Sequence, residues 1–407
     1  MREVVVIGGG ASGMMAAIAA ARCGAKVTLI EKNTQAGKKL LMTGNGRCNF
    51  TNQDQRLMHY RSQHQKLVEP VLKAFSMEDT VTFFKELGIV VKDRKGYLYP
   101  ASNQAVSVVK VLQLELRRLL VKEAYHTEVL SVKKQKEGFL VETEGWKYKA
   151  DAVILACGSM AAPKTGSTGD GYRFARQLGH TVGKVLPALT GVYVKEKDAE
   201  KLAGVRMEAK VTLLIDGKNH AEDEGEVQFA SYGLSGIPIF QISRYAAWAL
   251  EDGKKCEICL DFLKEHTFED VREILEKQKK YTQTRRGVDC LLGIFPEKLS
   301  QVLLLRAKIS AKKIRKDWTE EEIERLLIQI KRMGFFITRC RGYEQAQVCT
   351  GGVPLTEIKG TTMESLKSSG LYLTGELLDV DGACGGYNLQ WAWSSGYLAG
   401  VHAAKEE

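Results

Sequence analysis

Two glycine-rich segments near the start of the chain combine backbone freedom with small polar side chains. The first is GGGASG at residues 8–13, which satisfies G-x-G-x-x-G directly after an expected strand. The second is LLMTGNGRCNFTN at residues 40–52, which holds a single fixed positive charge. Because glycine has no Cβ, both segments can press their backbone against a large polar ligand. An ordinary surface loop is the alternative for the second segment.

The first segment belongs to a complete dinucleotide-binding unit at residues 3–31. After the glycines come an Ala- and Met-rich helical stretch and a second strand, 26–30, which ends in Glu31. Gly8 permits a sharp turn, and Gly10 permits close approach to a pyrophosphate. The helix N-terminus supplies N–H groups for phosphates, and Glu31 can accept hydrogen bonds from ribose hydroxyls. NAD and FAD both use this unit, so the segment alone leaves the cofactor open.

The C-terminal segment 370–400, GLYLTGELLDVDGACGGYNLQWAWSSGYLAG, predicts a second polar site. A short strand is followed by Gly375 and Glu376, and the glycine pair 385–386 then opens a final helix. A helix N-terminus there can stabilise partial negative charge, such as that on a reduced isoalloxazine ring. A plain docking helix is the alternative. Since dividing one cofactor site between the chain ends is typical of flavoproteins, the two segments together favour FAD.

A third segment, DAVILACG at residues 151–158, predicts a buried strand of the same sheet that ends in Gly158. Before it, residues 127–150 alternate around Gly138 and Gly145, which indicates a β-meander. In that meander Val129 is placed to touch an adenine ring through its backbone.

The bulk composition indicates a soluble protein of two or three domains. Its 407 residues are 44% apolar and 27% charged, and the nine cysteines lack the spacing of a disulfide framework. For the C-x-x-C at 256–259, a strand with buried thiols is favoured over zinc. The uncharged run 4–21 is interrupted by glycines, so we interpret it as strand, turn and helix, and expect a cytoplasmic protein. The net charge of +10 favours acidic partners without identifying one.

Motifs along nearly the whole chain resemble a family of bacterial FAD-dependent oxidoreductases, in the class with two dinucleotide-binding domains, that includes aminoacetone oxidases and 3-dehydro-bile-acid reductases. The motifs are GGGASG, EKNTQAGKKLLMTGNGRCNFTN, ILACGS, TGDGYRFARQLGH, YGLSGIP, CTGGVPLTEI and GELLDVDGACGGYNLQWAWSSG. The resemblance implies an α/β fold: a Rossmann-like FAD-binding domain with an inserted β-barrel-like domain and a helical subdomain. We expect the FAD-binding domain at 1–187 and 342–407, the barrel at 188–260 and 310–341, and the helical subdomain at 261–309.

The resemblance also implies that the loop 37–49 runs along FAD from the pyrophosphate towards the flavin. Lys38 and Arg47 would offset phosphate charge there, and catalytic thiol chemistry at Cys48 is not expected because no resolving cysteine is near. The expected cofactor-binding residues are Gly8, Gly10, Ala11, Ser12, Gly13, Glu31, Lys32, Gly37, Lys38, Lys39, Gly44, Asn45, Gly46, Arg47, Cys48, Asn49, Val129, Gly158, Gly375, Glu376, Asp379, Gly386, Asn388 and Leu389. No metal site is expected.

Two reaction directions fit a flavin site. Reduced flavin can deliver hydride to a C=C bond conjugated with a ketone, or an amine can be oxidised, with O2 then reoxidising the flavin. The resemblance favours a reductase of an unsaturated 3-oxo steroid, bile-acid-like compound or other enone, bound between the inserted module and the flavin. An aminoacetone-type amine oxidase is the alternative. NAD(P)H is a possible electron donor, although the sequence carries no second G-x-G-x-x-G unit after a strand.

Two tyrosines are candidates for the acid that protonates the substrate: Tyr232 in YGLSG and Tyr387 in GGYN. Each can instead be a structural hydrogen-bonding residue. His180 in QLGH is expected to terminate a helix, where a cationic side chain is favourable.

Basic clusters in the middle of the chain allow a different class of function. KQKK, RR and AKKIRK lie in the stretch 262–331, which is helical by pattern, and Tyr281 adjoins the first cluster. They could contact RNA, which would make the chain a flavin-containing RNA-binding protein. Interspersed glutamates favour ordinary solvated helix faces instead. A small-molecule substrate is therefore the expected partner, neither nucleic acid nor membrane is expected, and the sequence does not indicate an oligomeric state.

Overall fold

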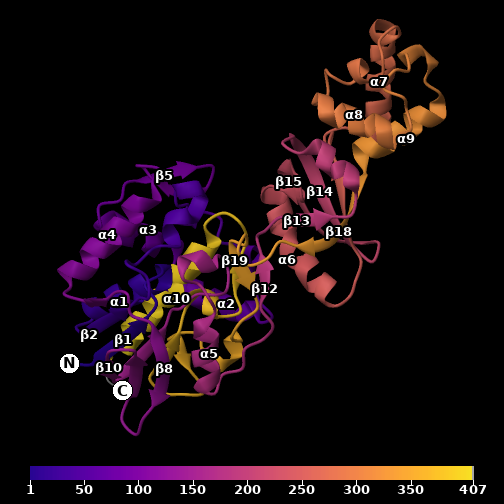
Figure 1. The fold of residues 1–407 in the computed structure, drawn as a ribbon. Helices are drawn as coiled ribbons and strands as arrows, with labels where there is room; N and C mark the ends of the chain where they lie inside the picture. The colour runs from indigo at the N-terminus through magenta and orange to yellow at the C-terminus, as the bar shows by residue number, and fades with distance from the viewer. Residues whose placement is uncertain (406–407) are drawn as a thin grey trace. The chain divides into compact units, whose positions relative to one another are not determined.

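A computed structural model describes residues 1–405, which divide into two compact units (Figure 1). Unit 1 comprises residues 1–186 together with 347–405, and unit 2 comprises Pro187–Ala346. The borders expected from the sequence are 187/188 and 341/342. The chain leaves unit 1 through β12 (Leu186–Ala188) and returns through β19 (Val348–Thr350). No helix among the described residues has the length and apolarity needed to cross a membrane.

Unit 1 is built around a sheet whose inner strands are parallel. In spatial order its strands are β20 (Ile358–Lys359), β21 (Glu364–Ser365), β22 (Leu371–Leu373), β11 (Ala152–Leu155), β1 (Glu3–Ile7), β2 (Lys26–Ile30) and β7 (Lys122–Ala124). Strands β22, β11, β1, β2 and β7 run parallel to one another, with Val4 opposite both Ala152 and Val27. The pairs β20–β21 and β21–β22 are antiparallel. Every residue of β11 and β22 is buried. Continuous apolar runs of this kind suit a sheet that is covered on both faces.

Smaller elements complete unit 1. The expected meander is present as β8 (Val129–Lys134), β9 (Phe139–Thr143) and β10 (Lys147–Ala150). The other strands are β3 (Thr51–Asn52), β5 (Val91–Arg94) and β6 (Tyr97–Pro100) in one sheet, and β4 (Tyr60–Arg61) with β23 (Asp381–Gly382) in another. The helices are α1 (Ala11–Arg22), α2 (Val68–Ala74), α3 (Met77–Glu86), α4 (Ala105–Arg118), α5 (Asp170–Gln177) and α10 (Tyr387–Ala403).

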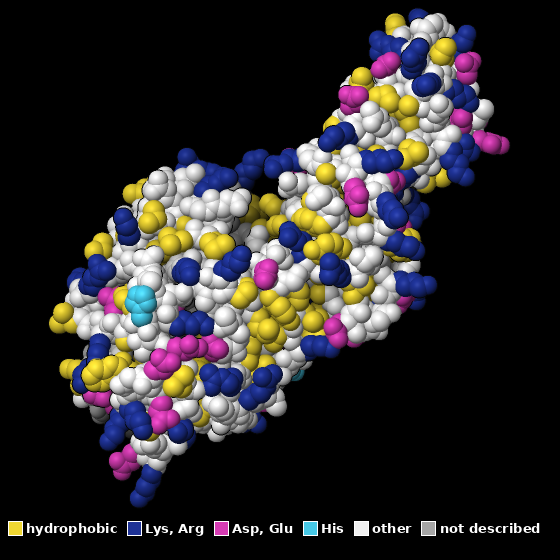
Figure 2. All heavy atoms as spheres, in the orientation of Figure 1, with side chains coloured by type: hydrophobic (Ala, Val, Ile, Leu, Met, Phe, Trp, Pro, Cys, Tyr) yellow, Lys and Arg dark blue, Asp and Glu magenta, His cyan; other side chains and the backbone are white. Residues whose placement is uncertain are grey.

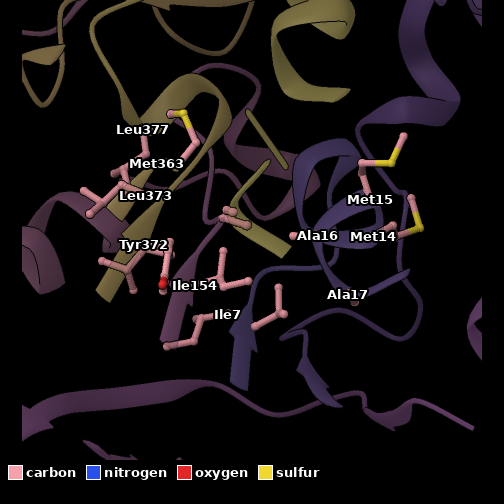
Figure 3. Packing of buried hydrophobic residues seen from close by; sticks show 14 of the residues in the cluster. Ile7, Met14, Met15, Ala16, Ala17, Ile154, Met363, Tyr372, Leu373 and Leu377 are labelled. Atoms are coloured by element: carbon pink, nitrogen blue, oxygen red, sulfur yellow. The ribbon is translucent and has the colours of Figure 1, made fainter. Parts of the chain in front are cut away.

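The first and last helices pack directly against each other (Figure 1). A Cβ added to Gly396 of α10 would lie 2.4 Å from the carbonyl oxygen of Ser12 in α1, and one added to Gly400 would lie 2.3 Å from that of Ala16. The two glycines are four residues apart, so they lie on one face of α10 and admit the backbone of α1. Figure 3 shows the adjoining core, in which Ile7 of β1 accompanies side chains of α1. The run 4–21 is therefore strand, turn and buried helix, as predicted.

Unit 2 contains a closed six-stranded barrel within the described residues. Its strands, in order around the barrel, are β13 (Val192–Val194), β16 (Gly233–Ser235), β15 (Lys218–Ala230), β14 (Arg206–Ile215), β17 (Cys256–Asp261) and β18 (Met333–Cys340). Residues along β17 alternate between buried and half-buried. Cys256 and Cys259 are three positions apart on this strand, so they point to opposite faces and cannot close around one metal ion. The predicted Rossmann-like domain with an inserted barrel is confirmed.

The helical part of unit 2 extends further along the chain than expected. It comprises α7 (Phe268–Thr282), α8 (Glu297–Arg306) and α9 (Glu320–Lys331), while α6 (Ile237–Glu251) packs on the barrel. The prediction that residues 310–341 belong to the barrel is wrong for α9, because β18 is the only element of that range that forms part of the barrel. Thr319 and Glu322 form a reciprocal capping box that starts α9. The sequence TEEE carries this signal.

Replacing Gly400 with valine should destabilise unit 1, because the new side chain must displace the backbone of α1. Overpacking of this kind costs about 3 kcal/mol. The free energy of unfolding is measured by urea titration with tryptophan fluorescence. Gly145→Val is the matched control, since a Cβ there meets no atom within 4 Å. Equal stability of the two variants would contradict the close packing of α1 on α10.

Candidate cofactor site

Four of the predicted residues follow the carboxyl ends of adjacent parallel strands. Gly8 follows β1, Glu31 follows β2, Gly158 comes shortly after β11, and Gly375 comes shortly after β22. Parallel strands share a direction, so these ends meet at one edge of the sheet. In open α/β sheets, ligands bind outside that edge. The sheet thus gathers residues separated by more than three hundred positions in the sequence.

The glycines of the 8–13 turn have different roles. Gly8 has a φ of +105°, and a Cβ on it would lie 2.5 Å from the carbonyl oxygen of Ala156. A Cβ on Gly13 would lie 1.8 Å from the carbonyl oxygen of Gly8, so this glycine permits the close contact between strand and helix. A Cβ on Gly10 would meet no protein atom within 4 Å. Helix α1 then begins at Ala11 without a side-chain cap, which leaves its first N–H groups for an anion.

Glu31 holds the glycine turn in place. Its Oε2 accepts a hydrogen bond of 2.7 Å from the backbone N–H of Gly9, and its Oε1 accepts two from Asn33, at 2.8 and 2.6 Å. A carboxylate oxygen has two lone pairs, so Oε2 can accept one more hydrogen bond. Glu31 therefore combines a structural role, which the sequence did not reveal, with capacity for a ribose hydroxyl.

The loop 37–49 adopts a conformation that requires its unusual composition. The N–H of Gly37 donates a hydrogen bond of 2.8 Å to the carbonyl oxygen of Gly9, which joins the loop to the 8–13 turn. Gly44, Asn45 and Gly46 are consecutive left-handed residues, with φ of 55°, 54° and 81°. Glycine adopts this region freely, and asparagine tolerates it better than most residues do. A Cβ on Gly46 would also meet nothing within 4 Å.

The predicted lysines are engaged with other side chains. Lys39 pairs with Glu376 at 2.6 Å, which links two predicted cofactor residues from opposite ends of the chain. Lys32 pairs with Asp170 at 2.6 Å, and Lys38 donates to Asn33 at 3.2 Å. Arg47 is exposed. Of the four predicted cations, Arg47 alone forms no hydrogen bond or ion pair with a described side chain, so its guanidinium remains for a phosphate.

The C-terminal residues mostly shape the loops. A Cβ on Gly386 would lie 2.7 Å from the backbone of Thr51, so close packing requires a glycine there. The amide of Asn388 is satisfied within its own loop, since it accepts from the N–H of Gly382 at 2.8 Å and donates to that residue's carbonyl oxygen at 2.9 Å. Asp379 accepts from the N–H of Gln63 at 3.0 Å.

Two further predicted residues lie in the surrounding packing. Val129 is buried and pairs with Thr143 in the meander, while Leu389 is half-buried against the main core.

Two buried polar atoms at the predicted site have no hydrogen-bond partner among the described residues: Oδ1 of Asn49 and Oε1 of Glu376. Burying such atoms without a partner costs roughly 1–3 kcal/mol each. Together with the open space beside Gly10 and Gly46, they fit a large polar ligand that lies along the strand ends. FAD fits this donor and acceptor set, and Ser12, Glu31, Arg47 and Asn49 would contact it.

Cys48 is fully buried and unsuited to thiolate chemistry. Burial raises the pKa of its thiol to about 12, and a hydrogen bond from Thr43 opposes this effect only in part. Cys48 has a left-handed backbone with a φ of 58°, so it contributes to the turn of the loop through its backbone.

The two candidate tyrosines belong to different units. Tyr232 lies in unit 2, with its ring 4.3 Å from the guanidinium of Arg341 and 5.5 Å from the ring of Tyr193. Tyr387 is the first residue of α10 and is 5% exposed. Burial, followed by the charge of Asp54, raises its pKa well above the usual range, so it stays protonated at neutral pH.

Sequence reasoning missed a histidine beside Tyr387. The ring of His59 stacks on that of Tyr387 with centroids 4.6 Å apart, and its Nε2 lies 2.9 Å from Oδ2 of Asp54. Arg56 holds the pKa of Asp54 well below its usual range, so this carboxylate stays ionised beside the imidazole. In the sequence, the only signal for this cluster is the spacing of five positions between Asp54 and His59.

His180 does not act as the cationic end of a helix. Its N–H closes α5 by bonding the carbonyl oxygen of Ala175, but its side chain is buried between Glu357 and Ser365 at 2.8 and 2.7 Å. Burial lowers its pKa, and Glu357 opposes this only in part, so the neutral form is favoured at pH 7.

Comparison with known proteins shows the family and the fold. The family model described as HI0933-like protein Rossmann domain matches residues 2–402. The chain is 44% identical to the 3-dehydro-bile acid delta(4,6)-reductase of Clostridium scindens, with 100% of both chains covered. It is 30% identical to the ribosomal RNA dihydrouridine synthase of Haemophilus influenzae, with 99% of both covered. The structure of 3-ketosteroid delta1-dehydrogenase from Sterolibacterium denitrificans shares the fold, with a TM-score of 0.50, 12% identity, and coverage of 99% of this chain and 100% of that one.

The fold and the strand-end site define a dinucleotide-binding protein of the Rossmann class. The chain belongs to the HI0933-like family of FAD-dependent Rossmann proteins. Membership confirms the resemblance inferred from the motifs, and it implies a flavin cofactor and an oxidoreductase.

Gly10→Ala should weaken FAD binding without destabilising the apoprotein. The added methyl group meets no protein atom, and the φ of −77° at Gly10 suits alanine, so only a ligand on the turn would be displaced. We expect the Kd for FAD to rise about ten-fold or more. Flavin fluorescence quenching gives the Kd, and Gly145→Ala is the control. An unchanged Kd would place the pyrophosphate elsewhere.

Iodoacetamide at pH 8 should modify Cys23 and spare Cys48. With a pKa of about 12, only about one Cys48 thiol in ten thousand is ionised at that pH, and the side chain is also buried. Cys23 is exposed. Peptide mass spectrometry measures both sites, and denatured protein should label at both. Equal labelling of the native chain would show that Cys48 is accessible.

Proposed function

We propose that the protein is a FAD-dependent reductase of a C=C bond conjugated with a carbonyl group. The full-length similarity to a delta(4,6)-reductase carries this proposal. A 4,6-diene beside a 3-oxo group contains C=C bonds that are conjugated with a carbonyl group. The dihydrouridine synthase supports the same reaction type, since dihydrouridine is uridine saturated at the C=C bond next to a carbonyl. The shared element is the chemistry, whereas the two substrates differ greatly in size and charge. An unsaturated 3-oxo steroid is the first substrate class to test.

Bound flavin would supply hydride transfer, and the protein would supply position and a proton. Strand ends and the first turn of α1 would hold the phosphates, while the 43–49 loop and the Gly375 turn would lie along the remainder of the cofactor. Hydride addition to the carbon β to the carbonyl leaves negative charge that spreads to the carbonyl oxygen. The α carbon must then receive a proton from an acid or from water.

His59, Tyr387 and Tyr232 are the proposed proton donors. The first two form one cluster at the N-terminal end of α10. Asp54, 2.9 Å from Nε2 of His59, and the stacked ring of Tyr387 would together fix the orientation of the imidazole. A donor acts on the substrate rather than on the nicotinamide. Its loss should therefore slow oxidation of the reduced flavin by substrate without slowing reduction of the flavin.

The reductase assignment is tested in two anaerobic steps. The yellow protein is mixed with NADH or NADPH, and absorbance near 450 nm should fall. Addition of a 4-ene-3-oxo steroid, or of a uridine-containing RNA, should restore it. Mass spectrometry then identifies the product, whose mass should exceed that of the substrate by two hydrogens. Bleaching by an amine such as aminoacetone without nicotinamide would instead establish an amine oxidase.

His59→Gln and Tyr387→Phe should separate the two half-reactions. Stopped-flow absorbance should give an unchanged rate of flavin reduction, and a rate of reoxidation by substrate that falls about 10²-fold or more for the true donor. Tyr232→Phe is examined in parallel. If no variant changes the ratio of the two rates, water supplies the proton.

A further inference from the structure

Two adjacent segments of the helical part form a basic surface, which we call the paired loops: residues 280–286 and 308–316. Their sequences, KYTQTRR and KISAKKIRK, contain no aspartate or glutamate. The N–H of Arg315 bonds the carbonyl oxygen of Arg285 at 3.0 Å, and that of Lys316 bonds Gln283 at 3.1 Å. Arg286 and Ile314 also form an antiparallel bridge. The two segments are therefore held side by side.

Most cations of the paired loops are free of acidic partners. Lys313 pairs with Glu322, and the buried Arg315 pairs with Glu276. The remaining six are exposed and form no ion pair with any described residue: Lys280, Arg285, Arg286, Lys308, Lys312 and Lys316. Asp289 and Asp317 are the nearest acidic residues in sequence, and both are exposed.

This pattern differs from the rest of the helical part. Lys277 pairs with Glu273, Arg272 with Glu320 and Glu324, and Arg306 with Asp198. On the face drawn in Figure 2, Lys and Arg side chains are frequent over this part of the chain, with acidic side chains between them. The solvated-face interpretation therefore suits the helices, whereas the paired loops concentrate six cations that form no ion pair with a described side chain.

An aromatic side chain lies within the same surface. Tyr281 is 74% exposed, and the ammonium group of Lys280 lies 5.7 Å from the centre of its ring. A phenol ring left in water beside cations can stack on a nucleobase while the cations contact phosphates. Closely spaced arginines add planar donors that match phosphate oxygens.

We propose that the paired loops bind the phosphate backbone of RNA, with Tyr281 stacking on an unpaired base. This goes beyond the proposed reduction, because it assigns a binding surface outside the cofactor site, and its test needs no turnover. Cations that neutralise phosphates release counterions, so the affinity must fall steeply with salt.

The test uses the full chain with FAD bound and a fluorescein-labelled RNA hairpin of about 30 nucleotides, long enough to span several phosphates. Fluorescence anisotropy gives the Kd between 50 and 250 mM KCl. We expect Arg285→Ala/Lys312→Ala to weaken binding roughly ten-fold and to reduce the slope of log K against log salt by about 1.5 to 2. A second double variant, Lys280→Ala/Lys316→Ala, should show a similar loss of affinity and a similar reduction of the salt slope.

The matched control is Lys210→Ala/Lys277→Ala, which removes two charges that pair with Glu222 and Glu273. Its Kd and salt slope should stay near those of the native chain. Tyr281→Ala should weaken binding to the hairpin loop while leaving the salt slope unchanged, because stacking releases no counterions. FAD absorbance and the unfolding midpoint confirm that each variant is folded.

Three results would overturn the proposal. They are an absence of RNA binding by the native chain at 50 mM KCl, an equal loss in the control and loop variants, and binding to phosphatidylserine vesicles in place of RNA. Loss of the substrate reaction with RNA binding intact would count against the proposed reduction alone.

Discussion

The contact between α1 and α10 is the constraint on which the cofactor site depends. Gly396 and Gly400 present bare backbone to Ser12 and Ala16, so the two helices approach more closely than any side chain allows. Because α1 begins in the 8–13 turn and α10 is the last helix of the described chain, this packing joins the two ends of the chain in one unit. Residues that follow strands β1 and β22 then share one edge of the sheet.

Helix α10 also fixes the two loops that complete the site. Trp391 donates to the carbonyl oxygen of Gly375 at 3.0 Å, and Ser395 accepts from the N–H of the same residue at 3.0 Å. Trp393 donates to the carbonyl oxygen of Phe50 at 2.9 Å, at the end of the 43–49 loop. These bonds are buried, where a lost partner is costly. One apolar helix therefore positions backbone groups that belong to two distant segments.

Backbone geometry, rather than charged side chains, accounts for most of the site. Several polar residues that look like ligand contacts in the sequence hold the protein's own loops, as Glu31 and Asn388 do. Different proteins with a scaffold of this kind can bind the same cofactor and act on different substrates. Function must therefore be argued from groups outside this scaffold, such as the proposed proton donor His59 and the paired loops.

Local sequence determined the elements and the cofactor unit. The glycines at 8–13, the apolar strands and the terminal Glu31 follow from short-range steric and hydrogen-bonding rules, so residues close in sequence suffice to predict them. Tertiary structure alone decided which polar groups remain for a ligand. Lys39 is satisfied by a partner that packing supplies, Glu31 keeps capacity for one more hydrogen bond, and Asn49 keeps a buried oxygen without a partner. It also decided the neighbours of His59 and of the paired loops, because segments distant in the chain meet only when the core is closed.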